Sequence, residues 1–260
     1  MPPNKSPLRY PGGKTRAIQI LDAHLQKHFP GRKTILSPFL GGGSFELYLQ
    51  AKGYTIRAND LFTPLYTFWK ILAERPQALE AAVKEQCPVS KELFQDLRKS
   101  ILQLDDELDV ATAYYIVNRC SFSGATFCGG FSQEASTGRL NESALKTLLK
   151  VDMTNITLSN MDCLKFLDEN PETPDSIVYA DPPYYISTYV YGKDGDMHEA
   201  FNHVEFAKKI KARGNWILCY NDCATIRELY KDCRIIKVAW AYGMNAKKES
   251  SEVLILPATR

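Results

Sequence analysis

At 260 residues, with 45% hydrophobic and 24% charged side chains, the chain has the composition of an ordinary globular protein, which excludes a disordered, fibrous or disulfide-dense one. The formal net charge of +2 neither indicates nor excludes a nucleic-acid partner, because net charge says little without its distribution. The length suits one large domain, or one domain that carries a smaller inserted one.

The pattern along the chain predicts strands and helices in alternation. An extended run at 34–37 (TILS) is followed by a helical pattern at 44–53 and by a second extended run at 54–60 (YTIRAND). Two strands around one helix form a βαβ unit, so we predict an α/β fold with an open, Rossmann-like sheet. The second half repeats this alternation, with strands expected at 155–160, 176–180, 215–220, 233–241 and 251–258 and helices at about 163–170, 198–213 and 224–231.

Between these halves the pattern changes to long amphipathic helices. Residues 65–86 (LYTFWKILAERPQALEAAVKEQ) and 91–104 (KELFQDLRKSILQL) both show helical periodicity. The segment at 118–140 is rich in Gly, Ser and Phe, which predicts a β-hairpin or an ordered loop. We therefore divide the chain into an α/β domain, 1–62 and 151–260, and an inserted helical subdomain, 63–150.

A glycine-rich turn follows the first expected strand. Gly41, Gly42 and Gly43 precede a helix, and consecutive glycines let a backbone approach a ligand closely at a helix N-terminus. Asp60 ends the next strand, where a carboxylate can accept hydrogen bonds from a ribose. The plainer interpretations are a tight connection and a helix N-cap. Because no Walker lysine follows the glycines, a nucleoside triphosphate fits poorly, and a dinucleotide leaves the sequence DPPYY at 181–185 unexplained. We therefore predict S-adenosylmethionine, which has a ribose and no phosphate, as the cofactor.

The sequence DPPY, Asp181 to Tyr184, follows another expected strand, at the sheet edge where such folds bind ligands. Pro182 and Pro183 restrict the backbone, which holds the Asp181 carboxylate still. The carboxylate and the Pro182 carbonyl can accept both hydrogens of an aromatic amino group, and Tyr184 can stack on the base. The alternative for Asp181 is a turn or cap without catalytic function.

These residues resemble a known family. DPPY, together with PFLGGGSF at 38–45 and PLRYPGGKTRAI at 7–18, is similar to the Dam-like DNA adenine-N6 methyltransferases over most of the chain. The resemblance implies an S-adenosylmethionine-dependent catalytic domain and a DNA target-recognition subdomain at 63–150. It also implies cofactor contacts by residues of the N-terminal motif, the glycine turn, the strand ends and DPPY itself: Tyr10, Lys14, Pro38, Phe39, Gly41, Gly43, Asp60, Asp162 and Asp181. For Asp162, a helix N-cap is the competing interpretation.

The 118–140 segment is similar to the DNA-contacting hairpin of the same family. The resemblance implies DNA contacts by Arg119, Phe122 and Arg139. Ser121 and Ser123 stand where a glycine and an asparagine are usual, and a leucine replaces the aromatic residue after GR. These departures bear on the recognised sequence more than on the reaction.

We therefore expect methyl transfer to N6 of an adenine flipped out of duplex DNA. Transfer to cytosine N4 or to RNA is the nearest alternative, since DPPY serves any exocyclic amine, and a catalytically silent DNA-binding module is a further one. We expect the catalytic residues to be Asp181, Pro182, Pro183 and Tyr184. A restriction-modification partner nuclease cannot be predicted from this chain.

The remaining features concern cofactors and location. The seven cysteines include no CxxC pair, so we expect free thiols in a cytoplasmic protein. Its host, whether bacterial, phage or viral, stays open. The four histidines lack a third ligand, so we expect no metal. No apolar run reaches the roughly 20 residues that cross a bilayer, so we expect no membrane association. We expect a monomer in solution.

Overall fold

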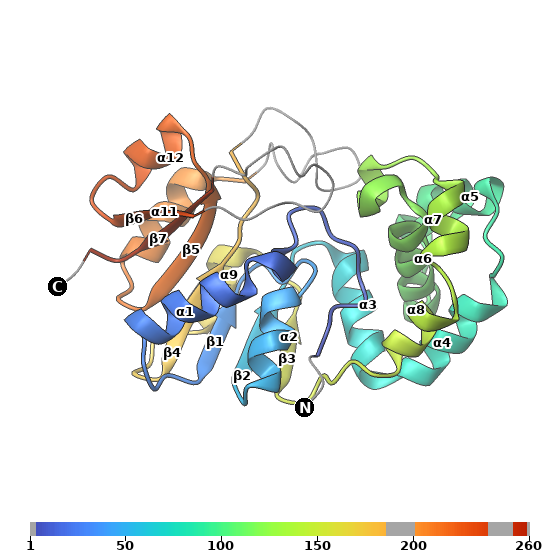
Figure 1. Ribbon diagram of the computed structural model, residues 1–260, viewed down its shortest axis with the longest axis horizontal. Helices are drawn as coiled ribbons and strands as arrows, with labels where there is room; N and C mark the ends of the chain where they lie inside the picture. The colour runs from blue at the N-terminus through green and yellow to red at the C-terminus, as the bar shows by residue number, and fades with distance from the viewer. Residues whose placement is uncertain (1–3, 186–200, 239–251, 259–260) are drawn as a thin grey trace.

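A mixed sheet of seven strands forms one half of the molecule (Figure 1). The computed structural model describes residues 4–185, 201–238 and 252–258. Within them the strand order is β3-β2-β1-β4-β5-β7-β6, and β7 runs antiparallel to both of its neighbours while the others pair in parallel. The strands are β1 (Thr34–Ser37), β2 (Thr55–Asn59), β3 (Ile156–Ser159), β4 (Ser176–Ala180), β5 (Trp216–Asn221), β6 (Arg234–Val238) and β7 (Glu252–Leu256).

Strand β4 shows why both faces of this sheet are covered. All five of its residues are buried. Ile177 and Tyr179 pack in one hydrophobic cluster, whereas Val178 and Ala180 pack in a second cluster on the opposite face. Side chains of a strand alternate between faces, so an unbroken apolar run indicates burial on both sides. The helices that accompany the sheet are α1 (Ile18–His28), α2 (Ser44–Ala51), α9 (Cys163–Glu169), α11 (His203–Lys211) and α12 (Ala224–Leu229), with a 3₁₀ turn η1 (Lys14–Arg16) before α1.

The chain order reverses between β1 and β4, which are neighbours in the sheet. Connections that leave the ends of these two strands run in opposite directions, so a crevice opens there at the carboxyl edge. The glycine turn follows β1 and Asp181 follows β4. The structure confirms the predicted α/β, Rossmann-like sheet, and it brings the two candidate motifs to the same crevice.

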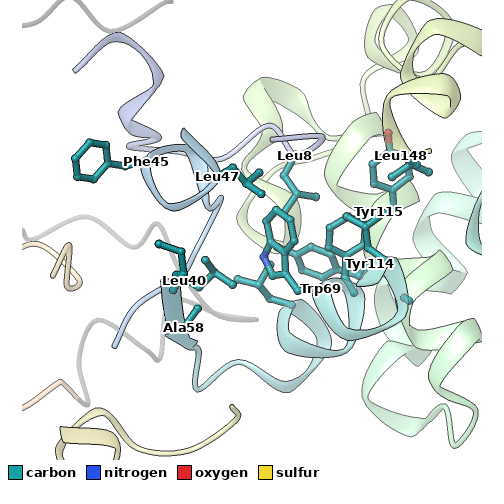
Figure 2. Packing of buried hydrophobic residues seen from close by; sticks show 14 of the residues in the cluster. Leu8, Leu40, Phe45, Leu47, Ala58, Trp69, Tyr114, Tyr115 and Leu148 are labelled. Carbon is teal, nitrogen blue, oxygen red and sulfur yellow. The ribbon is translucent and has the colours of Figure 1, made fainter. Parts of the chain in front are cut away.

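A group of helices lies beside the sheet (Figure 1). Its central member is α6, which has ten buried residues and packs against α3, α4 and α5. The buried rings of Trp69, Tyr114 and Tyr115 continue the hydrophobic core from Ala58 on β2 toward Leu148 (Figure 2). The core is therefore continuous from the sheet into these helices. They are α3 (Thr63–Glu74), α4 (Pro76–Glu85), α5 (Lys91–Ser100), α6 (Glu107–Cys120), α7 (Gln133–Gly138) and α8 (Glu142–Leu148), with a 3₁₀ turn η2 (Ile101–Gln103) after α5.

The single helix predicted across 65–86 is wrong. Helix α3 ends before Arg75, whose φ of −140° lies outside the helical range, and α4 begins at Pro76. Proline lacks a backbone N–H and disfavours the helical conformation in the residue before it. The chain therefore turns here and sends α4 along α6.

The β-hairpin predicted at 118–140 is also wrong. The segment forms two 3₁₀ turns, η3 (Phe122–Gly124) and η4 (Thr126–Cys128), followed by α7. One isolated antiparallel bridge, Ser121 to Phe131, closes the loop. Ser123 and Thr126 have positive φ, which extended strands do not allow. The alternative expectation of an ordered loop fits residues 121–132, whereas 133–138 form the helix α7, which the Gly- and Ser-rich composition did not predict.

Candidate active site

The glycine turn after β1 is held by Asp60, which follows β2. Asp60 accepts a hydrogen bond from the Gly41 N–H at 2.9 Å and another from the Phe62 N–H at 3.0 Å. Gly41 and Gly43 have φ values of +50° and +62°, which favour glycine. Burial raises the pKa of the Asp60 carboxyl to about 6, although the two backbone N–H groups oppose the shift. The carboxylate thus shapes the turn, and each of its oxygens retains a lone pair for a further donor.

The YPGG segment forms a tight turn that packs on the glycine turn. The Gly13 N–H donates to the Tyr10 carbonyl at 3.0 Å, and Gly12 has a φ of +72°, as a type II turn with Pro11 in second position requires. A Cβ added to Gly42 would lie 2.7 Å from the Tyr10 Cβ. Gly42 is therefore needed for the close approach of Tyr10, a role that the sequence did not reveal.

Lys14 is a buried cation, 4% exposed, at the centre of the crevice. Its ammonium donates to the Gly12 carbonyl at 2.9 Å and the Tyr184 hydroxyl at 2.9 Å, and it pairs with Asp181 Oδ2 at 2.6 Å. Burial alone would lower the pKa of Lys14, but Asp181 and Glu252 outweigh it and raise the pKa. An ammonium has three donors, so these three contacts use all of them. In this structure Lys14 therefore supports the DPPY motif directly.

The two carboxylate oxygens of Asp181 differ: one is paired and the other accepts no hydrogen bond from the described residues. Oδ2 pairs with Lys14, whereas Oδ1 is buried and finds no hydrogen-bond partner among the residues that the structure describes. Burial raises the pKa of the carboxyl, and Lys14 counteracts this shift. A buried acceptor without a donor is costly, so it indicates a site for a ligand donor.

The rest of the motif is fixed by the neighbouring strands β5 and β7. The Tyr184 hydroxyl donates to Glu252 Oε2 at 2.7 Å. Asn221, the last residue of β5, holds the backbone of Tyr185 with both amide atoms, at 3.0 and 2.9 Å. The sequence analysis identified neither Glu252 nor Asn221. Glu252 carried a weak signal, as the one charged residue of the apolar strand EVLIL.

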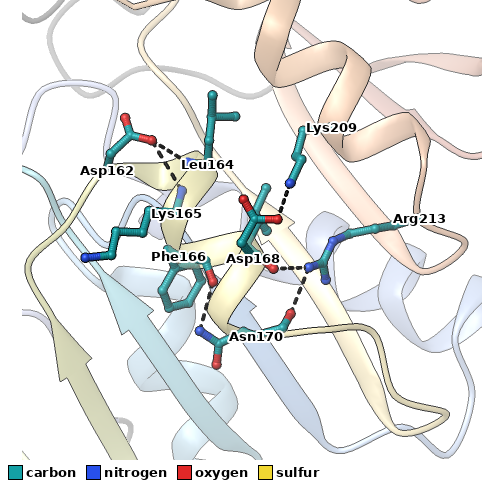
Figure 3. A network of polar contacts seen from close by, with 9 residues as sticks. Asp162, Leu164, Lys165, Phe166, Asp168, Asn170, Lys209 and Arg213 are labelled. Atoms are coloured by element: carbon teal, nitrogen blue, oxygen red, sulfur yellow. Dashed lines mark hydrogen bonds and ion pairs between the residues drawn. The ribbon is translucent and has the colours of Figure 1, made fainter.

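Asp162 lies at the N-terminus of α9 (Figure 3). Its Oδ1 accepts hydrogen bonds from the Leu164 and Lys165 N–H groups, so the N-cap interpretation is confirmed. An ion pair between Asp168 and Lys209 ties α9 to α11. The capped helix thereby holds Asp162 at the edge of the crevice.

One cavity of about 420 Å³ joins these features. It is lined by all nine residues expected to contact the cofactor: Tyr10, Lys14, Pro38, Phe39, Gly41, Gly43, Asp60, Asp162 and Asp181. Pro183 also lines it, whereas Pro182 is buried and Pro182 and Tyr184 do not reach the wall. The volume lies in the usual range for a small-molecule site.

Glu46 on α2 also lines the cavity and was not identified from the sequence. It is 3% exposed, and its Oε1 accepts a hydrogen bond from the Ser37 hydroxyl at 2.7 Å. Burial raises the pKa of its carboxyl to about 7. A glutamate between Phe45 and Leu47 in a mostly apolar helix was the available signal.

The three residues expected to contact DNA lie outside the cavity: Arg119 in the last turn of α6, Phe122 in η3 and Arg139 directly after α7. Phe122 is 65% exposed and Arg139 is exposed. The Arg119 guanidinium is half-buried and donates to the Arg139 carbonyl at 2.9 Å and to the Pro7 carbonyl at 3.2 Å. Arg119 thus connects the N-terminal segment to the backbone of Arg139.

The described part of the chain offers neither a metal-binding cluster nor a membrane-spanning helix. Residues 4–185, 201–238 and 252–258 contain no group of three or more His, Cys, Asp or Glu side chains that could hold a metal ion. None of the helices in these ranges is long and apolar enough to span a membrane.

Comparison with known proteins gives two consistent matches. The family model of the D12 class N6 adenine-specific DNA methyltransferases matches residues 10–244. Two curated proteins named DNA adenine methylase, from a classical Ogawa and an El Tor Inaba strain of Vibrio cholerae serotype O1, are each 26% identical over 248 residues. Each alignment covers 88% of this chain and 85% of the relative.

Proposed function

Because the chain belongs to the D12 class N6 adenine-specific DNA methyltransferases, we propose that its cavity binds S-adenosylmethionine and that Asp181 presents the adenine amino group to the methyl donor. Adenine methylation of DNA follows from the family itself, which favours this reaction over cytosine N4 and RNA as substrates. The observation that carries the proposal is the open, buried Oδ1 of Asp181 at the wall of a cavity lined by all the expected cofactor residues.

The charges around the cavity support this cofactor. Four acidic side chains, Glu46, Asp60, Asp162 and Asp181, line the cavity, and its lysine is already paired with Asp181. S-adenosylmethionine carries a cationic sulfonium and an ammonium, which such a site attracts, whereas the phosphates of a dinucleotide would be repelled. Asp60 would accept hydrogen bonds from the ribose of the cofactor, and the Asp162 end of the cavity would receive the adenine of the cofactor.

The DPPY motif would orient the substrate amine. Asp181 Oδ1 would accept one hydrogen of N6 and the Pro182 carbonyl the other, which directs the nitrogen lone pair away from the base plane. Lys14 keeps the carboxylate ionised and fixed through Oδ2. The cofactor supplies the methyl group as a sulfonium, and catalysis comes from positioning in a site that excludes water.

We further propose that the helices α3–α8 form the target-recognition part, with Phe122 and Arg139 facing the DNA. The exposure of both side chains supports this assignment. Arg119 would act indirectly, since its guanidinium already holds the Arg139 carbonyl. An adenine must leave the helix to reach Asp181, at a cost of about a few kcal/mol.

Asp181→Asn tests the proposal, because it keeps the shape and removes the charge. Incubation of duplex DNA with methyl-labelled S-adenosylmethionine, followed by nucleoside mass spectrometry, should give N6-methyladenine with the wild-type protein and at least about a hundredfold less with D181N. Binding of S-adenosylmethionine, measured by calorimetry, should persist in D181N.

The matched control is Asp105→Asn, an exposed carboxylate outside the cavity, which should keep full activity. Full activity of D181N would refute the assigned role of Asp181. N4-methylcytosine as the product would refute adenine as the substrate.

A further inference from the structure

Glu252 places a buried carboxylate behind the DPPY motif. It is 3% exposed and is the first residue of β7, whose other four residues are apolar and buried. Because β7 runs antiparallel to β5, its first residue pairs with Asn221 at the carboxyl edge of the sheet, where the crevice opens. Burying a carboxylate in an apolar strand is unfavourable unless specific partners compensate, so its contacts indicate its role.

The partner of Glu252 is the Tyr184 hydroxyl. That hydroxyl accepts a hydrogen bond from the Lys14 ammonium at 2.9 Å and donates to Glu252 Oε2 at 2.7 Å. The same ammonium contacts Asp181 Oδ2 at 2.6 Å, so the Asp181 and Glu252 carboxylates both lie near this hydroxyl. A phenolic hydroxyl has only one proton, so it can donate to one carboxylate at a time.

This competition determines whether Asp181 is available to the substrate. While Glu252 accepts the Tyr184 proton, Asp181 Oδ1 has no donor within the described residues. If the hydroxyl turned to Asp181, it would occupy or weaken the acceptor that the adenine amine needs. Lys14 cannot prevent this, since its ammonium presents only donors.

We propose that Glu252 is a positioning residue for methyl transfer: it accepts the Tyr184 proton and thereby keeps Asp181 Oδ1 open for the adenine amino group. The inference rests on the proposed function, because it assigns Glu252 an effect on the amine-binding carboxylate. It predicts an effect on kcat rather than on cofactor binding, since Glu252 does not line the cavity.

Glu252→Gln keeps the shape of the side chain and removes its charge. The amide is a weaker acceptor, so the Tyr184 hydroxyl turns to the ionised Asp181. We expect kcat to fall about 10- to 100-fold, with the affinity for S-adenosylmethionine changed less than about threefold. The control E228Q alters an exposed carboxylate on α12 and should keep kcat.

The Y184F/E252Q double variant separates positioning from simple destabilisation. Tyr184→Phe removes the hydroxyl and keeps the ring, so it should lower kcat less than E252Q does. In the double variant no hydroxyl remains to block Asp181, and kcat should recover to within about fivefold of Y184F. A purely structural role for Glu252 gives the opposite result, a double variant as slow as E252Q or slower, and this result would overturn the inference.

Two further outcomes are decisive. If E252Q does not fold, Glu252→Asp keeps the charge but withdraws the acceptor by one carbon, and its kcat should again be lower alone than in combination with Y184F. An unchanged kcat in a folded E252Q protein, while D181N is inactive, would refute the role of Glu252 and leave the proposed function intact. Full activity of D181N would instead remove the proposed function itself.

Discussion

Lys14→Met removes the cation that pairs with the Asp181 carboxylate in the crevice. Lys14 contacts Asp181 Oδ2 at 2.6 Å, and the Asp181 side chain is 22% exposed. Loss of one partner of a buried ion pair lowers the free energy of unfolding by about 3–5 kcal/mol. Because Asp181 is partly exposed, we expect a loss of about 3 kcal/mol at neutral pH. For a chain of this length that corresponds to roughly 6–12 °C in the unfolding midpoint.

The loss should depend on pH in a defined direction. Burial already raises the pKa of Asp181, and removal of Lys14 raises it further. A carboxyl whose pKa is higher in the folded than in the unfolded state destabilises the fold above its unfolded pKa, and the penalty disappears as the pH falls through the folded pKa. Glu46, whose pKa burial raises to about 7, acts in the same direction. The stability deficit of K14M should therefore be largest near pH 7.5 and shrink toward pH 5.

Thermal and urea unfolding of wild-type and K14M proteins at pH 5.0 and 7.5 would measure this deficit. The matched control is Lys70→Met, because Lys70 forms an ion pair of 2.7 Å with Glu107 on the exposed surface. K70M should leave the midpoint nearly unchanged, since exposed pairs contribute little. Adding D181N to K14M should restore much of the loss. Equal deficits at both pH values, or no recovery in the double variant, would refute the reasoning.

Two further substitutions test the packing of the glycine turn and the proposed contact of Arg139 with DNA. Gly42→Ala should lower stability by about 1–3 kcal/mol, because the added Cβ would lie 2.7 Å from that of Tyr10. Gly130→Ala meets no atom within 4 Å and should be neutral in urea unfolding; equal stability of both variants would contradict the packing argument. Arg139→Ala should weaken duplex DNA binding and reduce the magnitude of the salt slope by about 1, without changing the affinity for S-adenosylmethionine. Equal loss of both affinities would indicate misfolding instead.

The sequence by itself determined the sheet and the residues that gather at its edge. The apolar run of β4 reports burial on both faces, and the positions of the glycine turn and Asp181 directly after strands place them at the carboxyl edge. These are local signals, since each strand carries its own pattern and the parallel topology does the rest. Prediction of the nine residues expected to contact the cofactor also required the family resemblance, because a turn such as PGGK has no functional pattern of its own.

Only the tertiary structure decided which groups face one another. Lys14 meets Tyr184 across 170 positions of sequence, and Glu252 meets it across 68. No periodicity encodes such pairs, because they depend on the strand order and on the antiparallel direction of β7. The predicted hairpin failed for a related reason: positive φ at Ser123 and Thr126 reflects packing of the loop rather than its composition. The chain therefore specifies the position of Asp181, the proposed catalytic carboxylate, locally, while the residues around its two oxygens come from distant segments.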